Sequence, residues 1–181
     1  MQKRILVIIF LFYLAPSQNI YQGEVTFDYD GTVDGFFSSS IEDTLLTGFA
    51  FNQEIEDSAL FLMAAITQQN ENTFDLFVTI LRDTTYPIQP RVWDIPGEGD
   101  ENNPLSLESI LIFLPNLDSS FVTELFEIFT DTSFGQDSTE ILEYIFSELS
   151  NDLYLGLGGE LEISSTTETS ITGSFNSFMI K

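Results

Sequence analysis

A two-strand pattern occurs near both ends of this chain, and it constrains the fold more than any other feature of the sequence. The first copy covers residues 23–38 and the second covers residues 159–177. In each copy the returning segment reads apolar-x-Gly-x-Phe, around Gly35 and Gly173. Alternating apolar and polar residues bounded by turn residues are typical of a β-hairpin. We therefore predict hairpins at the two ends, as neighbours in one sheet or at equivalent places in a pseudo-symmetric sheet, with a chance match as the alternative.

The turn of the first hairpin sets which side chains share a face. A three-residue loop at 30–32 places Val25, Phe27 and Phe37 on one face, whereas a two-residue Asp-Gly loop sets Phe27 opposite Asp34. We predict the longer loop because it keeps the apolar side chains together.

Two segments in the middle of the chain, 59–67 and 73–81, carry apolar residues on both faces. Strands that are apolar on both faces lie in the middle of a sheet that is covered on both sides. The pattern predicts further strands at 45–51, at 92–95 as a short edge strand in a proline-rich stretch, and at 152–163 and 170–180 as the closing hairpin.

A helical insert at about 105–150 is expected to provide the second cover. The first predicted helix covers 107–114 and ends before a proline, and the second begins at Asp118 or Ser119. The third begins at Asp137, which forms a capping box with the glutamate three residues on. The predicted fold class is α+β, with a mostly antiparallel, curled or barrel-like sheet of seven or eight strands and a three-helix insert before the C-terminal hairpin.

Residues 1–17 have the features of a secretory signal peptide, with Lys3 and Arg4 before an apolar run at 5–14. A bilayer span needs about 20 apolar residues, so we expect this segment to be removed, to leave no integral membrane span, and to leave one domain at 18–181. The chain has no cysteine. Export without disulfides favours a periplasmic or extracellular setting in a bacterium.

The chain is strongly acidic, with 29 Asp and Glu against five Lys and Arg. Such a charge excludes nucleic acid and anionic membrane surfaces as partners. Two interpretations of the acidity stay open. It provides solubility or tolerance of a salty medium, or some of the carboxylates bind divalent cations.

The absence of histidine and cysteine restricts the available chemistry. It removes Ser-His-Asp and Cys-His nucleophile systems and histidine-ligated metals. No glycine-rich phosphate loop of the known spacings occurs. Paired carboxylates remain as a route to hydrolysis, but with 29 acids such a pair arises by accident. We therefore expect no enzymatic activity, and we assign no catalytic residue.

Three acidic segments are candidates for calcium, which takes six to eight oxygen ligands in loose geometry. The strongest is a loop with Asp94, Glu98, Asp100, Glu101 and Asn102. The other two are Asp28, Asp30 and Asp34, and Glu54, Glu56 and Asp57. A solvated acidic loop without a bound ion is the alternative for each of them.

The chain contains 18 phenylalanines, which form either an ordinary core or the lining of a cavity for an apolar ligand. Trp93 beside Arg91 is the candidate ligand contact, and its alternative is a loop side chain that packs into the core. We predict an exported, non-catalytic protein that binds an unknown protein, a glycan or a small apolar ligand. The alternatives are a calcium-dependent adhesion or glycan-binding module, and a carboxylate hydrolase.

Overall fold

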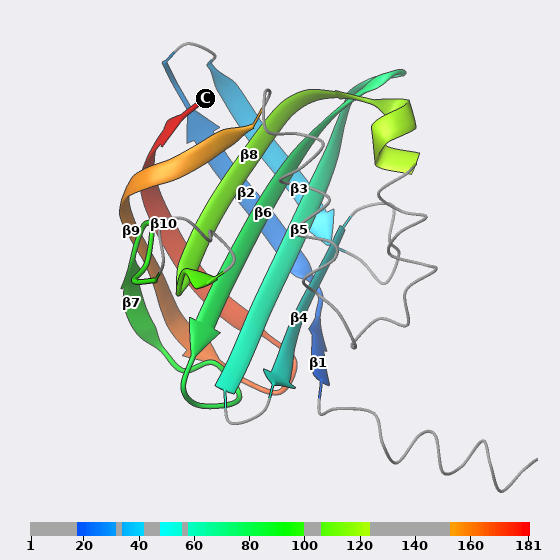
Figure 1. Ribbon diagram of the computed structural model, residues 1–181. Helices are drawn as coiled ribbons and strands as arrows, with labels where there is room; N and C mark the ends of the chain where they lie inside the picture. Colours follow the sequence, from blue (N-terminus) through cyan, green and yellow to red (C-terminus); the bar gives the residue numbers. More distant parts are fainter. Residues whose placement is uncertain (1–17, 32–33, 42–47, 56–57, 100–105, 124–152) are drawn as a thin grey trace, which may run out of the picture.

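The computed structural model describes residues 18–31, 34–41, 48–55, 58–99, 106–123 and 153–181. Within these residues the chain forms ten strands, which Figure 1 shows. In chain order they are β1 (Gln18–Tyr21), β2 (Gly23–Tyr29), β3 (Gly35–Ile41), β4 (Gly48–Ile55), β5 (Ser58–Asn70), β6 (Thr73–Asp83), β7 (Arg91–Asp94), β8 (Ser109–Asp118), β9 (Tyr154–Thr166) and β10 (Ile171–Ile180).

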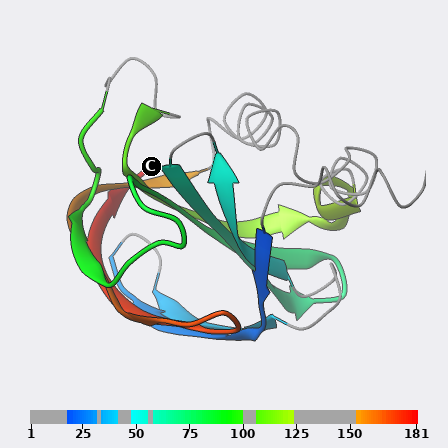
Figure 2. The same cartoon turned by 90° about the horizontal axis from the view of Figure 1, so that it is seen from below.

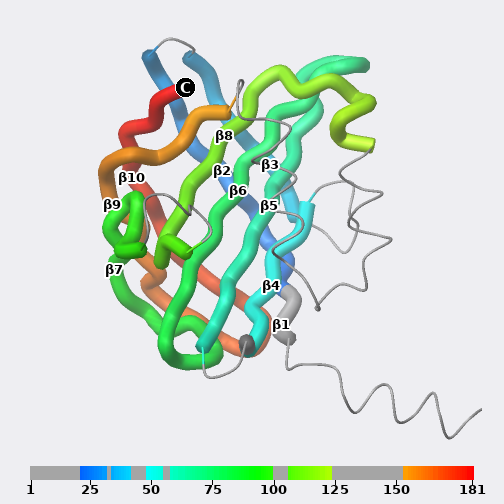
Figure 3. Tube along the Cα trace, in the orientation of Figure 1, coloured from blue at the N-terminus to red at the C-terminus, as the bar shows by residue number. Residues whose placement is uncertain are grey.

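The strands form one large antiparallel sheet and one small one. The large sheet has the order β1-β4-β5-β6-β8-β9-β10, and β7 pairs with β9 beside β8. The small sheet is the β2–β3 hairpin. The large sheet curls, and the hairpin lies across its concave side, as Figures 1 and 2 show from two directions. The trace in Figure 3 shows the same crossing of β2 and β3 behind β5, β6 and β8.

The large sheet buries side chains on both faces, as predicted for its central strands. The outer cluster, on the face away from β2–β3, includes Leu60, Leu62, Leu76, Val78, Ile110 and Ile112. The interior cluster, between the sheet and the hairpin, includes Phe37, Phe61, Phe77, Leu81, Leu111 and Phe113. Neighbouring residues of β5, β6 and β8 alternate between the two clusters because successive side chains of a strand point to opposite faces.

The prediction of an α+β fold with a three-helix insert is wrong. The segment 107–114, predicted as the first helix, lies largely in strand β8, which pairs with β6 and β9. Residues 110–114 are apolar at every position because both faces of β8 are buried, and such a run has no period that separates a strand from a helix. Pro115 is accommodated at a bulge opposite β6, where a missing backbone donor is tolerated.

The start predicted for the second helix is confirmed by one helical turn at 119–123. Asp118 caps this turn, since its Oδ1 accepts hydrogen bonds from the backbone nitrogen and the hydroxyl of Ser120, both at 2.8 Å. The rest of that helix and the third helix, predicted from Asp137, lie outside the described residues. The part of the chain that is described is therefore antiparallel sheet with very little helix, and it contains no helix that is long and apolar enough to cross a membrane.

The two similar hairpins do not share a sheet. The β9–β10 hairpin belongs to the large sheet, whereas β2–β3 forms its own. The predicted face of the first hairpin is confirmed, because Phe27 pairs with Phe37. The predicted three-residue loop is wrong, because the paired strands end at Tyr29 and Gly35. The hairpins meet instead through their side chains, with the rings of Phe27 and Phe175 centred 5.4 Å apart.

Candidate functional site

A cavity of about 350 Å³ lies inside the curled sheet. Its walls come from strands that are far apart in the sequence, including β1, β2, β5, β6, β9 and β10. Most of the lining is apolar, with Val25, Phe27, Phe61, Met63, Leu161 and Phe175 as its main side chains. Pockets for small molecules have this size and character.

The register of the strands explains why space remains at this place. Tyr21, Ala50, Met63, Thr79 and Leu111 are successive partners in one row across β1, β4, β5, β6 and β8. The second and fourth positions of this row carry small side chains. Since the row faces the concave side, these small residues leave room between the larger aromatic side chains around them.

An aromatic cluster lies next to the cavity. The ring of Phe27 stacks on Phe37 with centroids 4.7 Å apart, and it lies 4.9 Å from Phe77 and 5.6 Å from Phe113. Phe77 also stacks on Phe175 at 5.0 Å. Phe27 and Phe175 belong both to this cluster and to the wall of the cavity. The cluster therefore holds the wall in place through direct ring contacts, each contributing about 0.5–1.5 kcal/mol beyond burial.

The cavity borders two strand edges that have no backbone partner in the described part of the chain. β2 pairs with β3, and β10 pairs with β9 and ends the large sheet. Residues 21–27, 171 and 173–175 contribute to the lining from these two strands and the end of β1. Figure 2 shows the β9–β10 hairpin beside the β2 segment at this side of the sheet.

Two hydroxyl groups in the lining have no hydrogen-bond partner among the described residues. They are the phenol oxygen of Tyr21 and Oγ1 of Thr79, whose residues are 4% and 2% exposed. Asn52 is not part of the lining. It lies two residues after Ala50 on β4 and opposite Phe61, and its side-chain nitrogen and oxygen have no hydrogen-bond partner among the described residues. Buried polar groups almost always find partners in folded proteins. Tyr21 and Thr79 thus bring two buried hydroxyls without a partner among the described residues into the wall around the cavity.

These polar residues were missed in the sequence. Thr79 carries a weak signal, because it is a hydroxyl in the otherwise apolar run 76–81. Tyr21 and Asn52 carry none, since their place inside the sheet depends on the pairing of β1 with β4 and of β4 with β5.

The charged residues of the lining are Glu24 and Glu162, and both are exposed. The lining contains no Lys or Arg. The charge of the lining is thus negative and belongs to two exposed residues.

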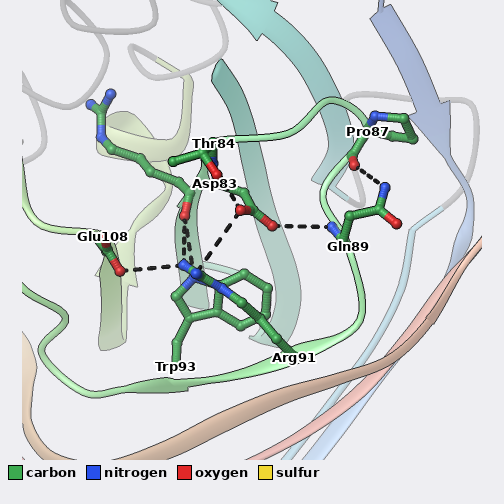
Figure 4. A network of polar contacts seen from close by, with 8 residues as sticks. Asp83, Thr84, Pro87, Gln89, Arg91, Trp93 and Glu108 are labelled. Carbon is green, nitrogen blue, oxygen red and sulfur yellow. Dashed lines mark hydrogen bonds and ion pairs between the residues drawn. The ribbon is translucent and has the colours of Figure 1, made fainter. Parts of the chain in front are cut away.

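Arg91 and Trp93, the predicted ligand contacts, lie together in a network away from the cavity lining (Figure 4). Trp93 is buried, donates from Nε1 to the carbonyl oxygen of Arg82 at 3.2 Å, and carries the Arg91 guanidinium 4.4 Å from its ring centre. Arg91 also lies 3.2 Å from Glu108 and 4.0 Å from Asp83. The burial of Trp93 matches the alternative of a loop side chain that packs into the core, and a ligand role for this pair stays a prediction.

Asp83 extends the network into the loop between β6 and β7. Its Oδ1 accepts from the backbone nitrogen of Thr84 at 2.7 Å, and its Oδ2 accepts from that of Gln89 at 3.2 Å. The Gln89 amide in turn donates to the carbonyl oxygen of Pro87 at 2.5 Å (Figure 4). These contacts hold the loop that leads to β7.

The strongest calcium candidate lies only partly within the described residues. Asp94 ends β7 opposite Glu160, and its carbonyl oxygen accepts a hydrogen bond from the Ser109 hydroxyl. The carbonyl oxygen of Glu98 accepts from the backbone nitrogen of Glu108 at 2.8 Å. Asp100, Glu101 and Asn102 lie outside the described residues. The calcium loop therefore stays a prediction.

Of the other two acidic segments, the structure describes one in full and one in part. Asp28, Asp30 and Asp34 are described, whereas Glu56 and Asp57 of the third segment are not. Within the residues that the structure covers, no three carboxylates come close enough together to hold a metal ion.

Comparison with protein-family models, with curated proteins and with solved structures gives no match for this chain. A proposal for the function therefore rests on the cavity and the residues that line it.

Proposed function

We propose that the protein binds a small, mostly apolar molecule in the cavity inside the curled sheet and does not convert it. The observation that carries this proposal is the cavity itself, about 350 Å³ among aromatic and aliphatic side chains. Pockets that bind small molecules are of this size and are lined mainly by hydrophobic and aromatic side chains. The mostly apolar walls therefore favour an apolar ligand.

The size of the cavity sets the size of the ligand. A cavity of about 150 Å³ accommodates benzene, so a cavity of about 350 Å³ fits a molecule of roughly twice that size, such as a two-ring aromatic compound. A longer flexible molecule reaches out between the unpaired edges of β2 and β10.

We place this binding outside the cytoplasm, because residues 1–17 have the pattern of a secretory signal. The calcium-dependent adhesion module and the carboxylate hydrolase have less support. The first rests mainly on residues 98–102, most of which lie outside the described residues, and the second has no assigned pair of carboxylates.

Fluorescence titration with naphthalene tests the proposal. We expect saturable binding at one site in the wild-type protein. Ala50→Leu and Ala50→Phe fill the cavity from the middle of its wall, so they should weaken and abolish binding, respectively. Ser40→Phe is the matched control, because Ser40 is exposed on β3 and outside the lining.

Circular dichroism of each variant establishes that it is folded, and Ala50→Leu keeps the test valid if Ala50→Phe does not fold. Absence of saturable binding to the wild-type protein would overturn the proposal. Unchanged binding in a folded Ala50→Leu variant would place the ligand elsewhere and overturn it equally.

A further inference from the structure

The edges of β2 and β10 lie side by side without pairing, and no backbone hydrogen bond joins them in the described part of the chain. Paired strands lie about 4.8 Å apart, whereas the Cα atoms of β2 and β10 are more than 8 Å apart along most of their length. The rings of Phe27 and Phe175 still meet across this space, with centroids 5.4 Å apart. We call the space between residues 23–29 and 171–180 the seam. A strand that pairs with both edges needs about twice the strand spacing between them.

β2 and β10 run in the same direction along the seam. Six successive antiparallel pairings lead from β1 to β10, so β10 runs in the same direction as β1. β2 continues from β1 after Gln22, and it ascends toward the same end of the molecule as β10 in Figure 1. One strand of opposite direction in the seam would therefore pair antiparallel with both neighbours and continue the pattern of the large sheet.

The inward side of the seam is apolar and incompletely covered. Val25 and Phe27 of β2, and Ile171 and Phe175 of β10, pack against the interior cluster but are only partly buried. Phe77 of the central strand β6, in contrast, is 0% exposed. The cavity extends along the four partly buried residues. Apolar side chains at alternate positions of an added strand would cover them, since alternate side chains of a strand point to one face.

The outward side of the seam is acidic. Glu24 and Asp28 are exposed on β2, and Glu160 and Glu162 are exposed on β9 next to β10. β2, β3, β9 and β10 contain no Lys or Arg, and Lys181 follows β10 at one end. Opposite charges on neighbouring strands attract, so the outward positions of an added strand favour Lys or Arg. A second copy of this chain does not match this requirement, because it has only five Lys and Arg against 29 acids.

We infer that the seam binds an extended peptide segment of a partner protein, in which apolar and basic residues alternate, as a strand antiparallel to β2 and β10. Main-chain hydrogen bonds to the two edges hold the segment, as in other proteins that bind a peptide by adding a strand to a sheet. Its apolar side chains cover the cavity, and its basic side chains lie near Glu24 and Glu162. This inference goes beyond the binding of a small molecule and does not depend on it.

A synthetic eight-residue peptide in which Val and Lys alternate tests the inference, since β2 offers seven residues for pairing. We expect saturable binding of one peptide per protein in a calorimetric titration at pH 7. The control peptide has the same composition, with the four Val before the four Lys. It should bind at least about tenfold more weakly, because half of its Val side chains would then face solvent.

Backbone N-methylation distinguishes a strand between two edges from a strand added to one edge. Alternate residues of an antiparallel strand direct their N–H groups to opposite neighbours. Methylation of the Val nitrogens therefore removes the donors toward one edge, and methylation of the Lys nitrogens removes those toward the other. Each methylated peptide should bind at least about tenfold more weakly than the parent peptide. Weakening by only one of the two methylations would show addition to a single edge and would overturn the inference.

Charge reversal beside the seam tests the acidic side. Glu24→Lys and Glu162→Lys should each weaken binding of the alternating peptide about threefold, and the double variant about tenfold. Glu71→Lys is the matched control, because Glu71 is exposed in the turn between β5 and β6, and it should leave the affinity nearly unchanged. Circular dichroism establishes that each variant is folded.

Three further results would overturn the inference. The first is the absence of saturable binding to the folded wild-type protein. The second is equal binding of the alternating and control peptides, or equal weakening by Glu71→Lys, since attraction by net charge alone would explain either. The third is a dimer in analytical ultracentrifugation that the peptide does not dissociate, because a second copy would then occupy the edges. None of these results concerns naphthalene, whose binding tests the proposed function separately.

Discussion

Phe27 stacks on Phe37 directly across the β2–β3 pair, with ring centroids 4.7 Å apart and ring planes 14° from parallel. The same ring of Phe27 contacts Phe77 of β6 and Phe175 of β10. The small sheet is thus attached to the large one mainly through aromatic side chains, together with a hydrogen bond from the Ser39 hydroxyl to the carbonyl oxygen of Ile66 at 2.7 Å.

Phe27→Ala should destabilise the protein by about 3 kcal/mol, because it removes a large side chain that several other rings contact. Phe178→Ala is the control, since Phe178 is 68% exposed, and it should change stability by less than about 0.5 kcal/mol. Chemical denaturation of both variants measures the difference. Similar losses in the two variants would show that the aromatic cluster does not hold the hairpin.

Thr79→Val should raise stability by about 1 kcal/mol in the absence of ligand, because a buried hydroxyl without a partner among the described residues is replaced by an apolar group of the same shape. Thr172→Val, at an exposed position, should have almost no effect. Thermal melting compares them. A loss of stability in Thr79→Val would mean that the hydroxyl makes a useful bond, for instance to water.

Arg91→Leu should cost about 1 kcal/mol, because it removes the stacking on Trp93 and the ion pairs with Asp83 and Glu108 while the side chain is partly exposed. Arg91→Lys should recover only part of this, since a lysine lacks the planar stacking surface. Denaturation curves of both variants give the comparison. Equal stability of the lysine variant and the wild type would show that charge alone matters.

Burial, and then the charges of Asp75 and Asp34, raise the pKa of Tyr29 above its ordinary value of 10.0. The folded state therefore keeps the phenol proton at a pH where the unfolded chain loses it. The resulting contribution to stability is complete below pH 10 and is lost as the pH rises through the pKa of the folded protein. Tyr29→Phe should lose less stability between pH 9 and 11 than the wild type, by urea denaturation at each pH. Parallel pH curves would contradict this assignment.

Added salt should raise the melting temperature, because the chain has a net charge of −24 and salt screens its self-repulsion. Calcium, magnesium and sodium at matched ionic strength separate screening from specific binding. A calcium site filled at about 100 times its dissociation constant adds roughly 2.7 kcal/mol. Equal shifts in the three salts would leave screening as the explanation, whereas an excess in calcium would support the loop at 94–102.

The strands and their buried faces were the most predictable part of this protein. Alternation placed Val25, Phe27 and Phe37 on one face of the first hairpin, and the continuous apolar runs predicted that β5 and β6 are central. The glycine shared by the two hairpins also has a local cause. A Cβ atom would meet the Tyr29 ring at Gly35 and the carbonyl oxygen of Glu162 at Gly173.

The segment 107–114 was predicted as a helix but lies largely in strand β8. Its apolar residues fit a helix that ends before Pro115 as well as a strand buried on both faces. This segment is a strand in the folded protein because its backbone pairs with β6 on one side and with β9 on the other. These partners lie far from the segment in the sequence, and the alternation pattern contains no information about them.

The sequence by itself determined that Val25, Phe27 and Phe37 share a face, that β5 and β6 are buried on both faces, and that histidine and cysteine chemistry is excluded, because these depend on residue type and on the two-residue period of a strand. Only the tertiary structure decided that β2–β3 forms a separate sheet and that Tyr21 and Thr79 line a cavity. The empty volume depends on the sizes of side chains brought together from eight strands, and whether a hydroxyl has a partner depends on what the fold places opposite it.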